Sequence, residues 1–326
     1  MRMIMKKKLM ALVMTACVAA TMLTGCGSSA GSKDTYTVGI CQLVQHPALD
    51  AATQGFKDAL TEKLGDKVKF NEQNASGESA TCSTIVNQFV SSGVDLILAN
   101  ATAPLQSAAA ATNTIPILGT SVTDYATALD ISDWNGTTGV NISGTSDLAP
   151  LAEQAAMLKE LFPDAQNVGM LYCSAEPNSE YQVKIVTGEL EKLGVTCKNY
   201  SFADTNDIAS VVTNAVSECD VIYIPTDNTA ASSTSVIDNV CRPAGVPVIA
   251  GEEGICKGCG VATLSISYYD IGYETGLMAY DILVNGADVS TMEVRFAPQV
   301  TKKYNAEICA ELGITVPDGY EAIEAE

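Results

Sequence analysis

The sequence predicts an α/β fold made of two similar lobes, each a parallel sheet flanked by helices. Short runs rich in Val and Ile alternate with longer helical patterns along the chain, which is typical of parallel sheets covered by helices on both faces. Four landmarks also recur in the same order 125 to 131 residues later. They pair Val38-Gly39-Ile40 with Val168-Gly169-Met170, Leu64-Gly65 with Leu193-Gly194, Asp95-Leu96-Ile97 with Asp220-Val221-Ile222, and Ile115-Pro116-Ile117 with Val246-Pro247-Val248.

The elements of the first lobe follow from the local hydrophobic pattern. Apolar and β-branched runs predict strands over 37–43, 68–71, 95–99 and 115–119. Amphipathic stretches predict helices over about 48–64 and 79–91, and a third that opens at Thr102 with Pro104 in its first turn.

The second lobe begins near Ser146, where the repeated pattern restarts. After about Tyr268 the sequence predicts one further helix, a strand near Val294 and a short last helix from Asn305. These elements come after both repeats are complete. We therefore expect them to pack onto lobes that are already built.

The N-terminal segment predicts export from the cytoplasm. Positive residues (Arg2, then 6–8) precede an apolar run over 9–23, which is the order found in signal peptides and is too short to span a bilayer comfortably. Leu23-Thr24-Gly25-Cys26 is similar to the lipobox of bacterial lipoproteins, in which cleavage precedes a lipid-modified cysteine. We expect a signal peptide over 1–25, lipidation at Cys26 and a flexible tether over 26–35. The alternative is an ordinary cleaved signal with a chance cysteine.

The charge balance excludes several classes of partner. The whole chain has a net charge of −20, and removal of residues 1–25, which carry four positive and no negative charges, leaves −24. So acidic a body is repelled by phosphate backbones and anionic lipid headgroups. Nucleic-acid binding is therefore not expected.

The cysteine content is high for an exported protein. Of eleven cysteines, Cys17 leaves with the signal and Cys26 would carry the lipid, so nine remain. Most lie in apolar contexts that favour buried free thiols. The motif Cys256-Lys257-Gly258-Cys259 has no second pair and no nearby histidine, which argues against zinc and leaves a local disulfide as the alternative.

The predicted ligand site lies where the strands end. In open α/β sheets, ligands bind beyond the carboxyl ends of the strands, where helix N-termini expose N–H groups. Two such lobes facing one another would form a cleft, lined by hydroxyls, amides and a few carboxylates and by no basic residue. The candidate ligand-binding residues are Gln42, Thr102, Thr120, Ser121 and Thr123 from the first lobe, Ser146 at the start of the second lobe, and Tyr172, Asn178, Ser179, Thr226, Asp227, Asn228, Glu252 and Tyr268 from the second lobe and its end.

This set of groups suits an α-amino acid. Ser121, Thr123 and the turn at Thr102 can donate to a carboxylate, while Asp227 and Glu252 are the best acceptors for an ammonium. We expect these two acids to stay partly hydrated when the cleft is empty, because a buried unpaired charge is costly.

The aromatic candidates and the helix starts have structural alternatives. Tyr172 and Tyr268 can pack against an aromatic ligand ring, but Tyr172 fits the core equally well. Thr102 is also a candidate helix N-cap, and Asp227 can simply begin a helix.

Signatures of catalysis are missing from the sequence. His46 is the single histidine, which leaves no His-rich metal site, and there is no GxSxG nucleophile elbow. The chain also lacks the GxxxxGK[ST] phosphate loop of nucleotide hydrolases. The sequence therefore predicts a binding protein without metal or cofactor.

Several motifs, in order, resemble the ABC-transporter substrate-binding proteins of the tryptophan/tyrosine type. They are Val38-Gly39-Ile40-Cys41-Gln42, His46-Pro47-Ala48-Leu49-Asp50, Ser121-Val122-Thr123-Asp124, Pro225-Thr226-Asp227-Asn228-Thr229, Gly251-Glu252-Glu253, Tyr268-Tyr269-Asp270 and Leu312-Gly313-Ile314. The resemblance implies the type I periplasmic-binding-protein architecture, in which two Rossmann-like lobes are joined by a three-stranded hinge.

The same resemblance implies crossings between the lobes near 144–147, 265–269 and 297–301. It assigns residues 36–145 plus about 270–298 to the N-terminal lobe. Residues 146–269 plus about 299–326 fall in the C-terminal lobe.

The function implied is that of the lipid-anchored binding component of an ABC importer, monomeric and held at the outer face of the cytoplasmic membrane. It would take up an aromatic amino acid by hinge closure and deliver it to a permease served by a separate ATPase. Two alternatives remain open. One is a sensory lipoprotein that signals without import, and the other is an importer component for a sugar, a nucleoside or a branched-chain amino acid.

Overall fold

The N lobe is built on a six-stranded parallel sheet. The computed structural model describes residues 33–324. The strands of this sheet are β1 (Tyr36–Gln42), β2 (Val68–Asn74), β3 (Leu96–Asn100), β4 (Ile117–Thr120), β5 (Ile142–Ser146) and β11 (Arg295–Phe296). The helices of the lobe are α2 (Pro47–Leu64), α3 (Ser79–Ser92), α4 (Thr102–Ala111), α5 (Tyr125–Leu129) and α12 (Tyr268–Asn285), with short 3₁₀ turns η1 (Gly65–Lys67) and η2 (Val289–Thr291). The predicted strands and helices of this lobe are present, whereas α5 was not predicted.

The C lobe is built on a seven-stranded sheet. Its strands are β6 (Asn167–Cys173), β7 (Thr196–Phe202), β8 (Val221–Ile224), β9 (Val248–Ala250), β10 (Ala262–Ser265), β12 (Thr301–Tyr304) and β13 (Glu321–Ala322). Its helices are α6 (Leu151–Leu161), α7 (Pro177–Lys192), α8 (Ile208–Val216), α9 (Asn228–Ala231), α10 (Thr234–Ala244), α11 (Glu253–Cys259) and α13 (Ala306–Glu311). Strand β12 runs antiparallel to β10, so this sheet is not wholly parallel.

The two sheets share one strand order, which explains the sequence repeat. The N-lobe order is β11-β5-β4-β3-β1-β2, and the C-lobe order is β13-β12-β10-β9-β8-β6-β7. Strands β1, β3 and β4 therefore correspond to β6, β8 and β9, which are the strands marked by the repeated landmarks. The predicted fold class is confirmed.

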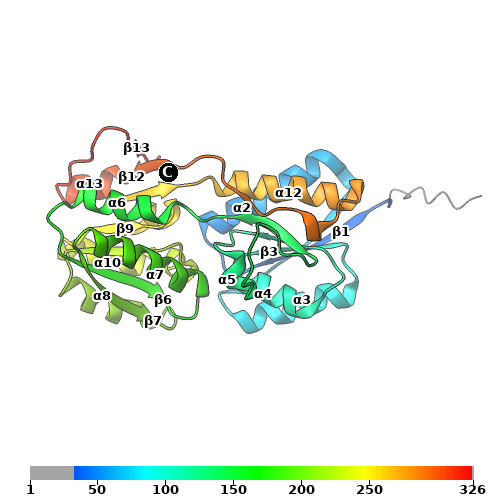
Figure 1. The fold of residues 1–326 in the computed structure, drawn as a ribbon, viewed down its shortest axis with the longest axis horizontal. Helices are drawn as coiled ribbons and strands as arrows, with labels where there is room; N and C mark the ends of the chain where they lie inside the picture. Colours follow the sequence, from blue (N-terminus) through cyan, green and yellow to red (C-terminus); the bar gives the residue numbers. More distant parts are fainter. Residues whose placement is uncertain (1–32, 325–326) are drawn as a thin grey trace, which may run out of the picture. The chain divides into compact units, whose positions relative to one another are not determined.

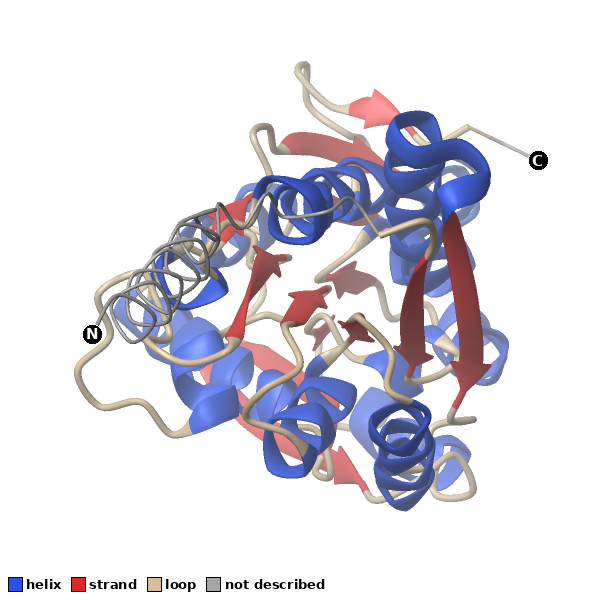
Figure 2. Cartoon of the chain, turned by 90° about the vertical axis from the view of Figure 1, so that its right-hand side faces the viewer, coloured by secondary structure: helices blue, strands red, loops and turns tan. Residues whose placement is uncertain are grey.

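Helices lie on both sides of the strands (Figure 2), and apolar side chains on both faces of each sheet hold them in place. In the N lobe one core cluster lies under α3 and α4, and another lies under α2 and α12. In the C lobe the clusters lie under α6, α7 and α13 on one face and under α8, α10 and α11 on the other. Burial on both faces accounts for the continuous apolar runs of the strands.

The chain passes between the lobes three times (Figure 1). It leaves the N-lobe sheet after β5 and enters α6, returns after β10 into α12, and crosses again between β11 and β12. Three covalent connections at one side leave the strand ends of the two lobes facing one another.

The predicted signal peptide and Cys26 lie outside the described residues, as does most of the predicted tether. Among residues 33–324, no helix is both long and apolar enough to cross a membrane.

Candidate functional site

Loops that follow the strands of both lobes meet at the interlobe cleft. His46, in the loop after β1, lies with Nε2 3.3 Å from Oδ1 of Asn228, at the start of α9 in the other lobe. Both side chains are buried. The structure therefore brings the lobes into contact at the strand exits, where the sequence predicted the site.

Two cavities lie where the lobes meet. The hinge cavity, of about 640 Å³, is lined by the start of α2, by α11 and by the crossing segments around Ser265–Asp270 and Pro298–Lys303. The outer cavity, of about 450 Å³, is lined by residues that follow β1, β2, β6 and β7 and by the start of α9. Both cavities have walls from both lobes.

The N-lobe side of the cleft contains strained backbone at two neighbouring strand exits. Ala101, after β3, has φ 99°, and Ser121, after β4, has φ 54°. Residues other than glycine rarely adopt such φ angles, and backbone strain of this kind concentrates at ligand sites. Ala101 occupies the N-cap position of α4. The expectation that Thr102 caps this helix is therefore wrong, because Thr102 is already its first residue.

Ser121 is the N-lobe hydroxyl best placed for a ligand, whereas the side chain of Thr123 is already hydrogen-bonded to Asp147. Both are buried, and Ser121 Oγ has no hydrogen-bond partner among residues 33–324. A buried hydroxyl without a partner is costly. A ligand carboxylate would satisfy it.

Three other N-lobe candidates are engaged within the lobe. Gln42 donates to Val44 O (2.9 Å) and to Asp50 Oδ1 (2.6 Å), and accepts from Thr53 Oγ1 at 2.6 Å. Thr120 Oγ1 lies 3.2 Å from Thr145 Oγ1 in the lobe interior. Ser146 Oγ donates to Thr123 O at 2.8 Å. These residues position the loops.

The two C-lobe acids expected to receive an ammonium both cap helices. Asp227 accepts from Ala230 N (2.8 Å), Cys173 N (2.7 Å) and Ser179 Oγ (2.8 Å). Glu252 accepts from Gly254 N at 2.6 Å, and from the next amide, at the start of α11. Each carboxylate keeps free lone pairs, so capping and ligand contact are compatible.

Burial raises the pKa of both acids to about 7, against the lowering effect of these N–H donors. For Asp227 the nearby Glu176 carboxylate adds to the rise, and for Glu252 the charges of Glu253 and Asp147 do so. Asp227 and Glu252 are 1% and 3% exposed. The expectation that they stay partly hydrated is therefore wrong, because each carboxylate is held by hydrogen bonds from the backbone N–H groups of a buried helix start.

The remaining C-lobe candidates hold the loop between β8 and α9. Asn178 Nδ2 donates to Thr226 O at 3.1 Å, and Thr226 Oγ1 donates to Gly251 O at 3.4 Å. Ser179 is bonded to Asp227, as described above. Tyr172 packs into the cluster beneath α6 and α7, which favours the core interpretation of this residue over a ligand platform.

Comparison with known proteins decides the family. The profile of the family described as ABC transporter substrate binding protein matches residues 37–324. A tyrosine-binding protein from Clostridioides difficile is 34% identical over 295 residues, which cover 86% of this chain and 85% of that protein. The chain is an ABC transporter substrate-binding protein.

Two solved structures of about one-third identity resemble this substrate-binding protein to different degrees. The ABC domain in complex with L-Trp from Streptococcus pneumonia gives a TM-score of 0.84 at 32% identity, covering 89% of this chain and all of that one. The ligand-free, open structure of a Clostridium difficile substrate-binding protein with adhesive properties gives 0.68 at 34% identity, with 90% and 100% coverage. The suspected family is confirmed. Its relatives are solute-binding proteins and not enzymes, and the family is extracytoplasmic.

The sequence pattern did not single out Asp147 of this substrate-binding protein, which the structure places beside the candidate residues Thr123 and Tyr268. Asp147 follows β5 and is 3% exposed. Its Oδ2 accepts from the hydroxyl of Tyr268 at 2.9 Å, and no partner for its Oδ1 exists in the described chain. Burial raises the pKa of Asp147, against hydrogen bonds from Thr123 and Tyr268. Its place at a strand exit, directly after Ser146, was the signal that could have identified it.

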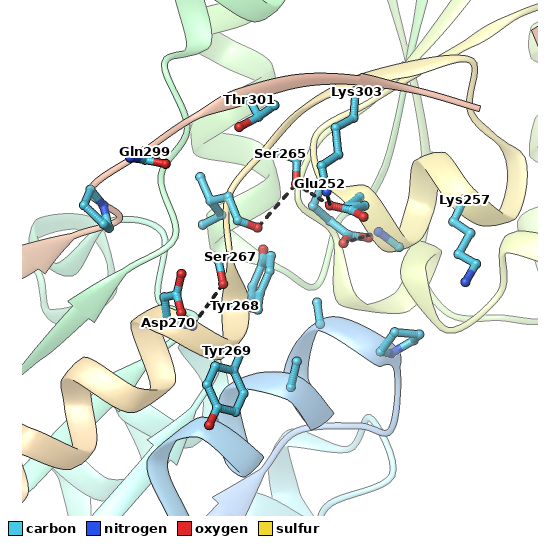
Figure 3. A pocket seen from close by; sticks show the side chains of 17 residues that line it. Glu252, Lys257, Ser265, Ser267, Tyr268, Tyr269, Asp270, Gln299, Thr301 and Lys303 are labelled. Carbon is cyan, nitrogen blue, oxygen red and sulfur yellow. Dashed lines mark hydrogen bonds and ion pairs between the residues drawn. The ribbon is translucent and has the colours of Figure 1, made fainter. Parts of the chain in front are cut away.

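Basic residues also line the cleft of the substrate-binding protein, contrary to expectation. Lys257 and Lys303 border the hinge cavity (Figure 3). Lys303 Nζ lies 2.8 Å from Oε2 of Glu253, which also accepts from Ser265 Oγ at 2.5 Å. Lys303 comes from β12, the strand that returns antiparallel, so its position depends on a pairing that the sequence pattern did not show.

Proposed function

We propose that this protein binds an aromatic amino acid between its lobes and delivers it to an ABC permease. The observation that carries the proposal is that two buried polar atoms at neighbouring strand exits, one a donor and the other an acceptor, have no hydrogen-bond partner among residues 33–324. Ser121 Oγ can donate to a carboxylate, and Asp147 Oδ1 can accept from an ammonium. The two groups belong to one region of the N lobe, because Thr123, two residues after Ser121, is hydrogen-bonded to Asp147. A zwitterion satisfies both groups at once.

Relatives support an aromatic side chain. One relative is named for tyrosine and one solved structure holds L-Trp. Tyr268 is a buried aromatic in the same region, and its ring can pack against a ligand ring.

Closure of the lobes around the ligand is the proposed mechanism. The higher TM-score against the Trp complex than against the open, ligand-free relative supports a closed arrangement here. The His46–Asn228 contact between the lobes supports it as well. A ligand that converts a 1:99 mixture into 99:1 must bind the closed form about 10⁴-fold better.

A thermal-shift screen of the purified full chain against amino acids, sugars and nucleosides tests the cargo. A ligand at 100 times its Kd should add about 2.7 kcal/mol to the free energy of unfolding. We expect tyrosine or tryptophan to stabilise the protein most. Stabilisation by a sugar or nucleoside, with no response to any amino acid, would reject the assignment.

Lipid anchoring and import need separate tests. Cys26→Ser should release the protein from the membrane fraction if Cys26 carries the anchor. Deletion of the gene should abolish uptake of the radiolabelled amino acid if the protein serves an importer. Normal uptake combined with a lost transcriptional or motility response to the amino acid would instead indicate a sensory lipoprotein.

A further inference from the structure

The chain's single histidine lies between the lobes, and only one of its two ring nitrogens has a hydrogen-bond partner in the described chain. His46 belongs to the N lobe, and its Nε2 is 3.3 Å from Oδ1 of Asn228 in the C lobe. The side chain is 6% exposed. No hydrogen-bond partner for Nδ1 exists among the residues that the structure describes.

The orientation of the Asn228 amide follows from its other contacts. Its Nδ2 donates to Oε2 of Glu176 at 2.7 Å, and its backbone N donates to the same oxygen at 3.0 Å. The second oxygen, Oε1, accepts from Thr229 N at 2.8 Å and Thr229 Oγ1 at 2.7 Å. A carboxylate surrounded by donors can only accept. The amide nitrogen of Asn228 must therefore face Glu176, and its oxygen must face His46.

This chain of hydrogen bonds sets the state of the imidazole. Asn228 Oδ1 is an acceptor, so Nε2 of His46 must carry the proton that is donated to it. Burial lowers the pKa of His46, against the raising effects of Asn228, Glu176 and Asp50. The ring is therefore neutral at pH 7, and Nδ1 presents a lone pair for which the described part of the chain offers no donor.

The place of His46 in the sheet suggests which part of a ligand reaches it. Ser121 follows β4, and β1, which leads to His46, lies two strands further along the order β4-β3-β1. Adjacent strands are spaced about 4.8 Å apart, so the offset is about 10 Å. That is close to the length of an extended aromatic amino acid. A ligand with its carboxylate at Ser121 thus brings the far end of its ring toward His46.

We propose that Nδ1 of His46 accepts a hydrogen bond from a donor on the ligand's ring, the phenolic O–H of tyrosine or the indole N–H of tryptophan. His46 then selects for aromatic amino acids whose ring carries a donor and against phenylalanine. This inference rests on the proposed function, because it requires an amino acid in the cleft.

Calorimetric titration of matched ligand pairs tests the selection. Tyrosine is compared with phenylalanine, and tryptophan with 3-(3-benzothienyl)alanine, in which sulfur replaces the indole N–H. We expect the donor-bearing member of a pair to bind roughly 3- to 10-fold tighter in the wild type, the effect of one net hydrogen bond. A preference in only one pair identifies which donor is used.

Two variants separate ligand selection from lobe contact. His46→Gln places an amide N–H near the Nε2 position and a carbon near Nδ1, so it should lose the preference while phenylalanine binding changes little. His46→Asn keeps a polar atom near Nδ1 but cannot reach Asn228, so it should bind all four ligands more weakly and retain the preference. Thermal unfolding of both variants without ligand establishes that they fold.

Nitrogen NMR gives a readout that needs no variant. Because the chain has one histidine, ¹⁵N-histidine labelling of protein purified without a histidine tag reports this ring alone. We expect protonated Nε2 and unprotonated Nδ1 in the free protein, and a change at Nδ1 when tyrosine or tryptophan binds.

Three results would overturn the inference. They are equal affinities within both pairs in the wild type, an equal loss for all four ligands in His46→Gln, and a protonated Nδ1 in the free protein. If no aromatic amino acid binds the wild type at all, the proposed function has failed as well, and the titrations distinguish that outcome from the others.

Discussion

The hydroxyl of Tyr268 donates to Oδ2 of Asp147 at 2.9 Å, while Oδ1 of the same carboxylate is left without a partner in the described chain. The two residues come from two of the three crossings between the lobes, since Asp147 follows β5 and Tyr268 begins α12. The bond therefore joins two hinge segments and fixes the direction in which the free oxygen points.

Replacement of Asp147 by Asn is expected to weaken ligand binding without weakening the fold. The free oxygen would otherwise make a charge-assisted hydrogen bond to the ligand ammonium, worth about 1.5–3 kcal/mol, so affinity should fall roughly 10- to 100-fold. The ligand-free protein should unfold at the same or a higher urea concentration at pH 8, because the variant removes a buried carboxylate with a raised pKa.

Tyr268→Phe is the matched control for this prediction. It leaves the Asp147 carboxylate buried without the bond from Tyr268 and with only Thr123 as a side-chain donor, so it should lower the free energy of unfolding as well as the affinity. Full affinity in Asp147→Asn, measured by calorimetry, would remove this carboxylate from the site.

Stability of the ligand-free protein is expected to fall as pH rises from 5 to 8. Asp227 and Glu252 have folded-state pKa values of about 7, against ordinary values near 4. Between these limits the native state holds protons that the unfolded chain has released, so the free energy of unfolding decreases with rising pH. Each group contributes up to about 1.4 kcal/mol per pH unit.

Urea unfolding at four pH values between 5 and 8 measures this slope. General repulsion in an acidic chain has the same sign, so the comparison must be with a variant of similar charge. The double variant Asp227→Asn, Glu252→Gln should flatten the profile. A slope equal to that of the wild type would assign the effect to surface charge and contradict the prediction.

Much of the architecture was predictable because it depends on local periodicity. The sequence repeat predicted that β1, β3 and β4 occupy the same positions in their sheet as β6, β8 and β9 do in theirs. The rule that ligands bind beyond the ends of the strands identified Ser121 and Asp227 as candidates, and both are buried where strands end. What the sequence did not show depends on contacts between distant segments. The antiparallel pairing that brings Lys303 to the cavity joins strands well separated in the chain. The strained backbone at Ala101 likewise has no signature in residue type.

The cysteine thiols are expected to be unreactive in the native protein. The nine cysteines in the described part of the chain are free thiols, and all but the half-buried Cys197 are buried. Burial also raises the pKa of most of them, including Cys173 and Cys309 to about 11, which disfavours the reactive thiolate.

Alkylation followed by peptide mass spectrometry checks this for each cysteine. In native buffer we expect slow labelling at Cys197 and almost none elsewhere, and after denaturation without reductant we expect all nine to react. A peptide in which Cys256 and Cys259 stay unlabelled until reductant is added would show the disulfide that the sequence left open.

Close packing of α2 against α12 makes glycine necessary at their crossing. A Cβ at Gly272 would lie 2.0 Å from Ala52 O, and one at Gly55 would lie 2.1 Å from Tyr269 O. The helices must therefore separate in Gly272→Ala, at a cost of about 1–3 kcal/mol or more. Because α12 begins at Tyr268, the shift should also disturb the bond to Asp147 and lower ligand affinity.

Gly188→Ala on α7 is the matched control, because an added Cβ there meets nothing within 4 Å. It should instead raise the free energy of unfolding by about 0.5–1 kcal/mol. Urea unfolding of both variants decides the matter, and equal stabilities would mean that the two helices are not held this close in solution.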